Sequence, residues 1–83
     1  MVTIYQVVTK IDRDGCWDAK TEHSTLKEAR KKAIAYLKDI YDRCFIYAEN
    51  MAGEYWYPLY LWKDGKGRIS QSTDTEFIEM MIH

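Results

Sequence analysis

The chain has 83 residues, of which 30% are charged, 47% are hydrophobic and 14% are aromatic, and its formal net charge is −1. This length and composition predict one folded domain with a small core, and they exclude a disordered chain. The near-zero charge argues against a generic nucleic-acid binder. Because the sequence shows neither a secretion signal nor the ~20 apolar residues of a membrane span, we expect a cytoplasmic protein that does not enter the membrane.

The first 22 residues predict a β-hairpin. Thr3–Ile11 is rich in β-branched and aromatic residues, as strands are. The turn sequence DRDG follows, in which aspartates can bond their own backbone and Gly15 can adopt a positive φ. In the next strand, which begins at Cys16, polar and apolar residues alternate, so one face is expected to be buried and the other exposed. The expected buried face holds Trp17, Ala19 and Thr21, and the expected exposed face holds Asp18, Lys20 and Glu22.

One amphipathic helix is predicted after this hairpin. Thr25 and Glu28 have the spacing of a capping box, in which each side chain serves a backbone N–H group of the first turn. Apolar residues then recur on one side of a helical wheel and charged residues fill the other side. The apolar side holds Leu26, Ala29, Ala33, Tyr36, Leu37, Ile40 and Cys44. We expect this helix to pack on one face of a sheet, with Leu26, Leu37 and Ile40 nearly fully buried.

Three further strands are predicted. Cys44–Glu49 is apolar on both faces, and a loop that contains Gly53 separates it from the aromatic stretch Glu54–Trp62. The sequence DGKG then predicts a turn, and Arg68–Ser72 predicts a short polar strand.

The C-terminal segment predicts a short helix. Thr73 and Glu76 form a second capping box, although Phe77–Ile82 would also be compatible with an edge strand. The order ββαβββ, with this helix at the end, predicts a single α+β domain over residues 1–83. Its sheet is expected to be largely antiparallel with four or five strands, and the longer helix should cover one face.

The aromatic strand carries large side chains on both faces. Strict alternation places Tyr55, Tyr57, Leu59 and Leu61 on one side and Trp56, Pro58, Tyr60 and Trp62 on the other. We assign the longer helix to the leucine side, because aliphatic side chains match its apolar face. The other side must be covered by the C-terminal segment, by a second copy in a homodimer, or by a different protein. Pro58 lacks an N–H, which fits an edge strand or a bulge.

A sheet face of this kind is suited to protein binding, because Trp and Tyr dominate binding hot spots. We therefore expect a small non-enzymatic protein-binding module. One alternative is a single-stranded nucleic-acid binder, in which bases stack on the aromatic strand and nearby cations contact phosphates. A small-ligand-binding domain or a structural homodimer is a further alternative. The expected partner-binding residues are Trp56, Tyr60, Trp62 and Lys63, and the nucleic-acid alternative uses Lys63, Lys66 and Arg68.

No catalytic, cofactor or metal-binding motif is recognisable. His23 and His83 lack the spacing of a zinc site, and the DRDG turn lacks the later ligands of a calcium-binding loop. Cys44 is expected to be buried, and no base is placed beside Cys16 to activate it. We expect no enzyme activity, no cofactor and no metal. The two cysteines are expected to be reduced, although a disulfide between them is also compatible with the sequence.

In its general character the chain is similar to small accessory proteins of phages and mobile elements, including inhibitors of the anti-CRISPR type. The similarity lies in the short length, the single domain and the lack of motifs, and it fixes no residue. It implies a role in which this protein binds and inhibits a protein of the host.

Overall fold

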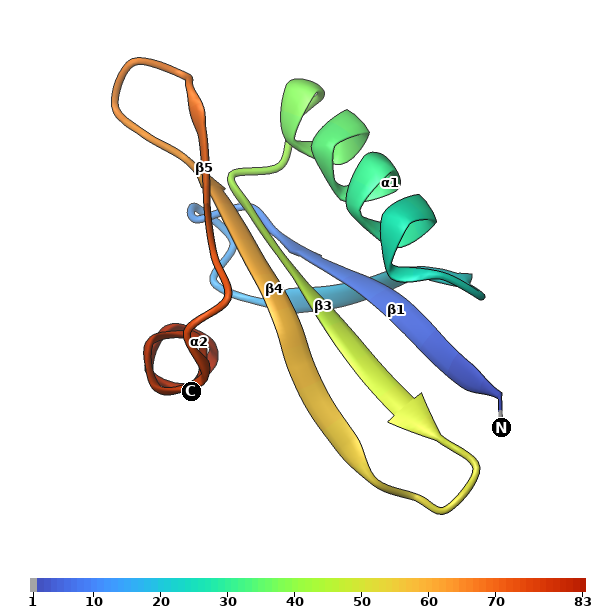
Figure 1. Cartoon of the computed structure of the whole chain (residues 1–83). Coiled ribbons are helices and arrows are strands. Elements are labelled where there is room, and N and C mark those ends of the chain that lie inside the picture. Colours follow the sequence, from blue (N-terminus) through green and yellow to red (C-terminus); the bar gives the residue numbers. More distant parts are fainter. Residues whose placement is uncertain (1) are drawn as a thin grey trace.

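A five-stranded antiparallel sheet is the framework of the structure, a computed structural model that describes residues 2–83 (Figure 1). The strands lie in the order β2-β1-β3-β4-β5, with helix α1 between β2 and β3 and helix α2 at the end of the chain. The predicted α+β class and element order are therefore confirmed, including the C-terminal helix. The elements are β1 (Thr3–Lys10), β2 (Trp17–His23), α1 (Leu26–Lys38), β3 (Arg43–Asn50), β4 (Tyr55–Lys63), β5 (Ile69–Ser72) and α2 (Thr75–Ile82).

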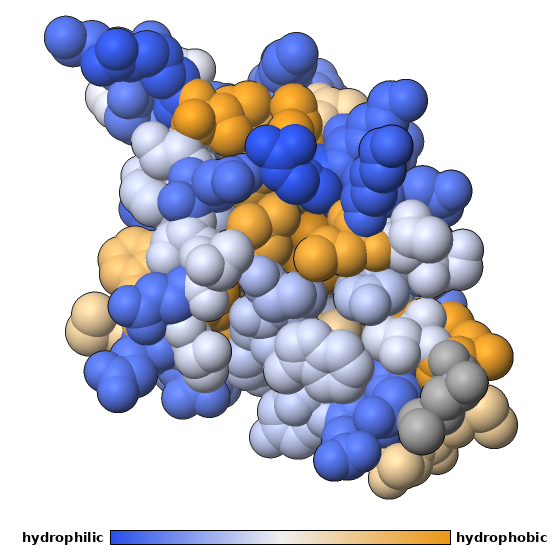
Figure 2. Space-filling model, viewed as in Figure 1, coloured by the Kyte–Doolittle hydropathy of each residue, from blue (hydrophilic) through white to orange (hydrophobic). Residues whose placement is uncertain are grey.

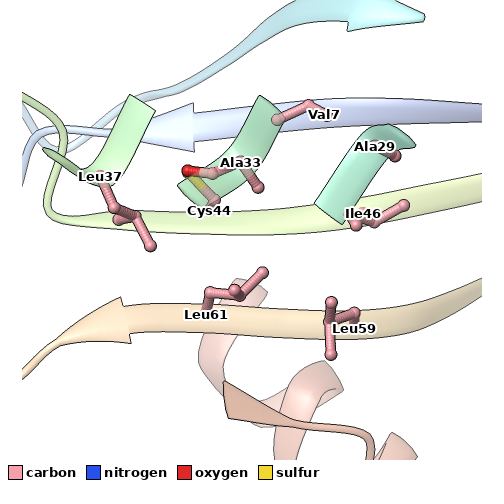
Figure 3. Packing of buried hydrophobic residues seen from close by; sticks show 8 residues of the cluster. All are labelled: Val7, Ala29, Ala33, Leu37, Cys44, Ile46, Leu59 and Leu61. Atoms are coloured by element: carbon pink, nitrogen blue, oxygen red, sulfur yellow. The ribbon is translucent and has the colours of Figure 1, made fainter. Parts of the chain in front are cut away.

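Helix α1 covers one face of the sheet. The side chain of Thr25 accepts a hydrogen bond from the Glu28 N–H at 3.2 Å, so the predicted cap is present. The helix turns two alanines and a leucine towards β1, β3 and β4 (Figure 3). The small alanine side chains let the helix lie close to the sheet. Most residues of the core between them have no solvent-exposed surface. This core holds Val7, Ala29, Ala33, Leu37, Cys44, Ile46, Leu59 and Leu61.

The predicted length of this helix is wrong. It ends at Lys38, where the N–H of Asp39 bonds to the Tyr36 carbonyl, so Ile40 lies beyond it and is 59% exposed. Leu26, in the first turn, is 37% exposed, and of the three expected core leucine and isoleucine residues only Leu37 is buried. Cys44 is buried because it lies on β3 beneath the helix, and not because the helix extends to it.

Helix α2 covers part of the opposite face. The carboxylate of Asp74 accepts from the N–H groups of Glu76 and Phe77, so Asp74 is the N-cap in place of the predicted Thr73. Ile78 is completely buried against Tyr60, and the Phe77 ring lies 5.6 Å from the Trp62 ring. Neither helix within residues 2–83 has the length and apolar character needed to cross a membrane.

A β-bulge in β2 changes the predicted alternation of that strand. Val7 of β1 pairs with Thr21 whereas the next residue, Val8, pairs with Ala19, so Lys20 is an additional residue on β2. Such an insertion reverses the faces of the residues on one side of it. Trp17 therefore packs on the α2 face, as Val8 does, whereas Thr21 lies on the α1 face with Val7. The prediction that Trp17 and Thr21 share a face is wrong.

A second bulge lies in β4. Ile46 of β3 pairs with Leu59 and Ala48 pairs with Trp56, so two residues of β4, Tyr57 and Pro58, lie opposite one residue of β3. Proline is tolerated at such a position because the irregular residue does not need its N–H for the ladder. The two bulges are the reason that strict alternation fails in both strands.

The faces of β4 consequently differ from the prediction. Trp56 lies on the α1 face beside Ala48, whereas Tyr60 and Trp62 lie on the α2 face. The predicted grouping of these three residues on one face is wrong. Tyr55 and Tyr57 lie on the α2 face, since their rings neighbour that of Tyr47, so their predicted place beside the leucines is also wrong.

One end of the sheet extends beyond both helices. Figure 1 shows that the start of β1 and the hairpin between β3 and β4 project away from α1 and α2. The molecule measures 40 × 24 × 21 Å as a result. Within residues 2–83, β5 pairs only with Tyr60–Lys63, so the first five residues of β4 have no strand neighbour on that side.

Candidate functional site

The predicted binding residues do not form one surface. Tyr60 has no exposed surface, and its hydroxyl accepts a hydrogen bond from Arg43 Nη1 at 3.0 Å. Trp62 is half-buried under α2, so the C-terminal segment covers this part of the sheet, as the first of the three alternatives proposed. Trp56 is 40% exposed on the opposite face, and Lys63 lies at the far end of β4.

The cations of the nucleic-acid alternative lie at the turn between β4 and β5. Arg68 Nε is 3.4 Å from Asp64 Oδ2, and Asp64 also accepts from the backbone N–H groups of Arg68 and Lys66. These backbone hydrogen bonds lower the pKa of the Asp64 carboxyl. The aromatic residues nearest to this turn, Tyr60 and Trp62, pack against α2, and the exposed tyrosine of β4 is at the other end of the strand.

A cluster of three tyrosines lies on the α2 face beside the part that α2 covers, with Tyr47 and Tyr57 half-buried and Tyr55 exposed. The Tyr47 ring centroid is 5.7 Å from that of Tyr55 and 5.9 Å from that of Tyr57, and the latter two are 6.1 Å apart. Tyr55 is 61% exposed. The rings come together because the bulge in β4 turns Tyr55 and Tyr57 to the face that carries Tyr47. We call these three residues the tyrosine cluster.

The pKa values of two hydroxyl groups of the cluster, those of Tyr47 and Tyr57, are raised. Tyr47 donates to Glu49 Oε1 at 2.7 Å, and this hydrogen bond raises the pKa of Tyr47 to about 12. Partial burial raises the pKa of Tyr57, and the negative charges of Tyr55 and Glu79 would add to this effect. Tyr47 and Tyr57 therefore keep their hydroxyl protons at physiological pH, and that of Tyr47 is held by Glu49.

A shallow groove of about 280 Å³ adjoins the cluster on the same face. Its floor is formed by uncharged residues of β1, and its walls come from β2, β3 and the turn after β3. Tyr47 lines the groove and also belongs to the tyrosine cluster, so the two features are continuous. The lining residues include Val2, Ile4, Gln6, Glu22, Tyr47 and Glu49. We call the groove and the tyrosine cluster together the open sheet face.

Both bulges build this surface. Without the extra residue in β2, Glu22 would point to the α1 face; with it, Glu22 pairs with Gln6 and lines the groove. Sequence reasoning missed the groove and Tyr47, because neither bulge has a local sequence signature apart from Pro58. That proline was the one available signal, since it marks an irregular position in an otherwise continuous strand.

The surface charge of the molecule is distributed unevenly. The open sheet face carries the carboxylates of Glu22 and Glu49, and residues 44–62, which form much of it, contain no Lys, Arg or His. By contrast α1 carries five cations and one carboxylate. Figure 2 shows one side of the molecule, on which strongly hydrophilic residues border hydrophobic ones in the upper part and paler residues lie in the middle of the lower part.

The structure shows two thiols in different environments. Cys44 is buried, its Sγ–H donates to the Ala33 carbonyl oxygen at 3.6 Å, and burial raises its pKa to about 12. Cys16 is exposed, and both cysteines are free. The disulfide between them that is compatible with the sequence is therefore not formed in the structure. Within residues 2–83 no three His, Cys, Asp or Glu side chains are grouped as metal ligands would be.

Comparisons of the chain with protein-family models, with curated proteins and with solved structures found no match.

Proposed function

We propose that this protein is a non-enzymatic module that binds another protein through the open sheet face. The main support is the tyrosine cluster, in which Tyr55 is exposed and Tyr47 and Tyr57 are half-buried on the sheet face that α2 covers elsewhere. Tyrosine rings combine a large apolar area with a hydroxyl group, and they lose little conformational entropy on binding. Because the rings stand on paired strands, their arrangement is held in place before a partner arrives.

Apolar side chains beside the cluster add to this support. Ile4 and Val2 are 40% and 57% exposed, and Met51 at the hairpin turn is 78% exposed. Together with the tyrosines they form an apolar area with a polar border, which is the usual composition of a protein interface. The general similarity to small phage inhibitors suggests that the partner is a host protein.

The nucleic-acid alternative has less support. A single-strand binder needs cations beside its stacking rings. Here the cations Lys66 and Arg68 lie at the opposite end of β4 from Tyr55, and the nearest charges to the tyrosine cluster are carboxylates, which repel phosphate.

The proposal is tested by site-specific photo-cross-linking in host cells. Tyr55 is replaced by the photoreactive amino acid benzoylphenylalanine, and in a matched control the same residue replaces Lys31 on the exposed side of α1. We expect irradiation to produce a discrete adduct with another protein from position 55, and none from position 31.

Four results would contradict the proposal, and the first is the absence of any adduct from position 55. Adducts of equal yield from both positions would indicate non-specific contact. An adduct that disappears on nuclease treatment would indicate nucleic acid. An adduct of twice the mass of the protein would show that a second copy covers the open sheet face.

A further inference from the structure

We infer that the segment bound by the open sheet face is a cationic, extended stretch of a partner protein that carries Arg or Lys side chains. This inference rests on the proposed function and specifies the chemistry of the partner.

The arrangement of charge on the open sheet face is the first reason. Glu22 on β2 and Glu49 on β3 stand on either side of β1, whose residues Ile4 and Gln6 are uncharged. Gln6 pairs with Glu22, and Ile4 pairs with Glu49, so the two carboxylates lie on neighbouring rungs of the sheet. Two strand spacings and an offset of two residues along the strands separate them by roughly 12 Å, a distance that two long side chains of one extended segment can span.

No cation of this chain neutralises that part of the surface. Residues 2–9 carry no charge, and residues 44–62 carry only two carboxylates, those of Glu49 and Glu54. Helix α2 adds Glu76 and Glu79 and contains neither Lys nor Arg. A partner with cationic side chains would therefore meet complementary charge over the whole face, which favours both correct orientation and rapid association.

The tyrosine cluster is the second reason. A Lys or Arg side chain is attracted to the face of an aromatic ring within about 6 Å of the ring centre. The chain makes this contact at other rings, since Lys10 lies 5.4 Å from the Trp17 centroid and Lys20 lies 5.1 Å from that of Tyr41. Within residues 2–83 no such contact is made at the tyrosine cluster, and its exposed member, Tyr55, is accessible to a cation from outside.

The two features act on the same ligand. Tyr47 belongs to both the cluster and the groove, and its hydroxyl donates to the Glu49 carboxylate. That carboxylate keeps further lone pairs with which it can accept from a guanidinium or ammonium group. Glu49 also pairs with Tyr55 across the sheet, so a cation at this point would touch a carboxylate and an aromatic ring together.

A second copy of the chain fits the surface less well. Two open sheet faces related by a two-fold axis would bring their carboxylates together. The cationic face of α1 could approach the open sheet face of another copy, but such a head-to-tail contact generates open chains of molecules unless the rotation closes a ring.

The inference is tested by nuclear magnetic resonance with two short acetylated peptides of equal length, one of alternating Arg and Thr and one of alternating Glu and Thr. The backbone amide signals of the isotope-labelled protein are followed during each titration at low salt. We expect the arginine peptide to shift the signals of Ile4, Gln6, Glu22 and Tyr47, and the glutamate peptide to leave them unchanged.

Two double variants with the same loss of charge locate the interaction. Glu22→Gln together with Glu49→Gln should lower the affinity of the protein for the arginine peptide by about fivefold, as expected for the loss of two partly exposed ion pairs. Glu28→Gln with Asp39→Asn removes two carboxylates at α1, on the other side of the sheet, and should change the affinity by less than about twofold. Thermal melting of both variants confirms that each is folded.

Four results would overturn the inference: no binding, shifts confined to residues outside the open sheet face, equal binding of both peptides, or equal weakening by the two double variants. Sedimentation that showed head-to-tail chains through α1 would overturn it as well. If position 55 cross-links to a host protein but the arginine peptide does not bind, the proposed function stands and this inference fails. If the peptide binds but no protein adduct forms, the proposed function fails.

Discussion

Cys44 lies beneath α1 with no exposed surface, and burial raises its pKa to about 12. Since the thiolate is the reactive form, this residue should be inert at neutral pH, whereas the exposed Cys16 should react. We expect Ellman's reagent to detect one thiol in the native protein and two after denaturation, and Cys16→Ser to remove the native reaction. Two reactive thiols in the native state would contradict the packing of β3 against α1.

Tyr47 owes its raised pKa first to the hydrogen bond that its hydroxyl donates to Glu49. Because the folded pKa is raised from 10.0 to about 12, the bond stabilises the folded state below pH 10.0, and this contribution is lost as the pH rises towards 12. The ultraviolet titration of tyrosinate in the native protein, minus that of Tyr47→Phe, isolates this residue. We expect Glu49→Gln to move its ionisation to lower pH, and an unchanged titration would show that the hydrogen bond is absent.

Helix α1 illustrates how burial differs along one element. Leu37 is fully buried over the sheet, whereas Leu26 in the first turn is 37% exposed. Leu37→Ala should lower the free energy of unfolding by about 2–4 kcal/mol through lost burial and a residual cavity, and Leu26→Ala should cost less than about 1 kcal/mol. Urea denaturation of the two variants measures the difference. Equal losses would mean that the helix is rotated or shifted from its described position.

Helix α2 offers a matched pair of the same kind. Ile78 is completely buried against Tyr60, and Met80, two residues later, is 72% exposed. Ile78→Ala should cost about 2–4 kcal/mol, whereas Met80→Ala should change stability by about 0.5 kcal/mol or less. If both variants were as stable as the native protein, α2 would not cover the sheet, and Tyr60 and Trp62 would be open to a partner.

The whole molecule combines a well-packed centre with a projecting end. Strand β3 lies in the middle of the sheet between the two helices, and the turn between β3 and β4 extends beyond both (Figure 1). The hydrogen bonds of that turn, such as that from the Gly53 N–H to the Asn50 carbonyl at 3.1 Å, join residues that are exposed or half-buried. Opening of this end therefore exposes little apolar surface, which makes it a region of low local stability.

Native-state hydrogen exchange tests this distribution. We expect the amides of Val7, Cys44 and Ile46 to exchange last, because they lie in the central strands under α1. The amides of Ala52, Gly53 and Glu54 should exchange first. Uniform protection along β3 and into the turn would contradict the view that the turn between β3 and β4 opens more readily than the central strands.

Much of the fold could be predicted from the sequence, because its signals are local. The Thr25 cap, the β-branched and aromatic composition of β1 and the turn at Gly15, whose φ is +73°, each depend on a few neighbouring residues. The element order and the α+β class follow from these signals. The sequence did not predict that α1 ends at Lys38, because the apolar helical pattern continues to Ile40 and Cys44. It did not predict Asp74 as the N-cap of α2, because Thr73 and Glu76 have the spacing of a capping box.

The candidate site depended on the tertiary structure. Tyr47, Tyr55 and Glu22 meet on one face only because extra residues in β2 and β4 reverse the alternation of those strands. A bulge is a property of the register between two strands, and residues far apart in the chain decide that register. The sequence by itself therefore determined which elements form and that aromatic residues would lie on both faces of β4. Only the packing of α2 decided which of those residues, Tyr60 or Tyr55, stays exposed, because a helix of eight residues covers just part of a sheet face.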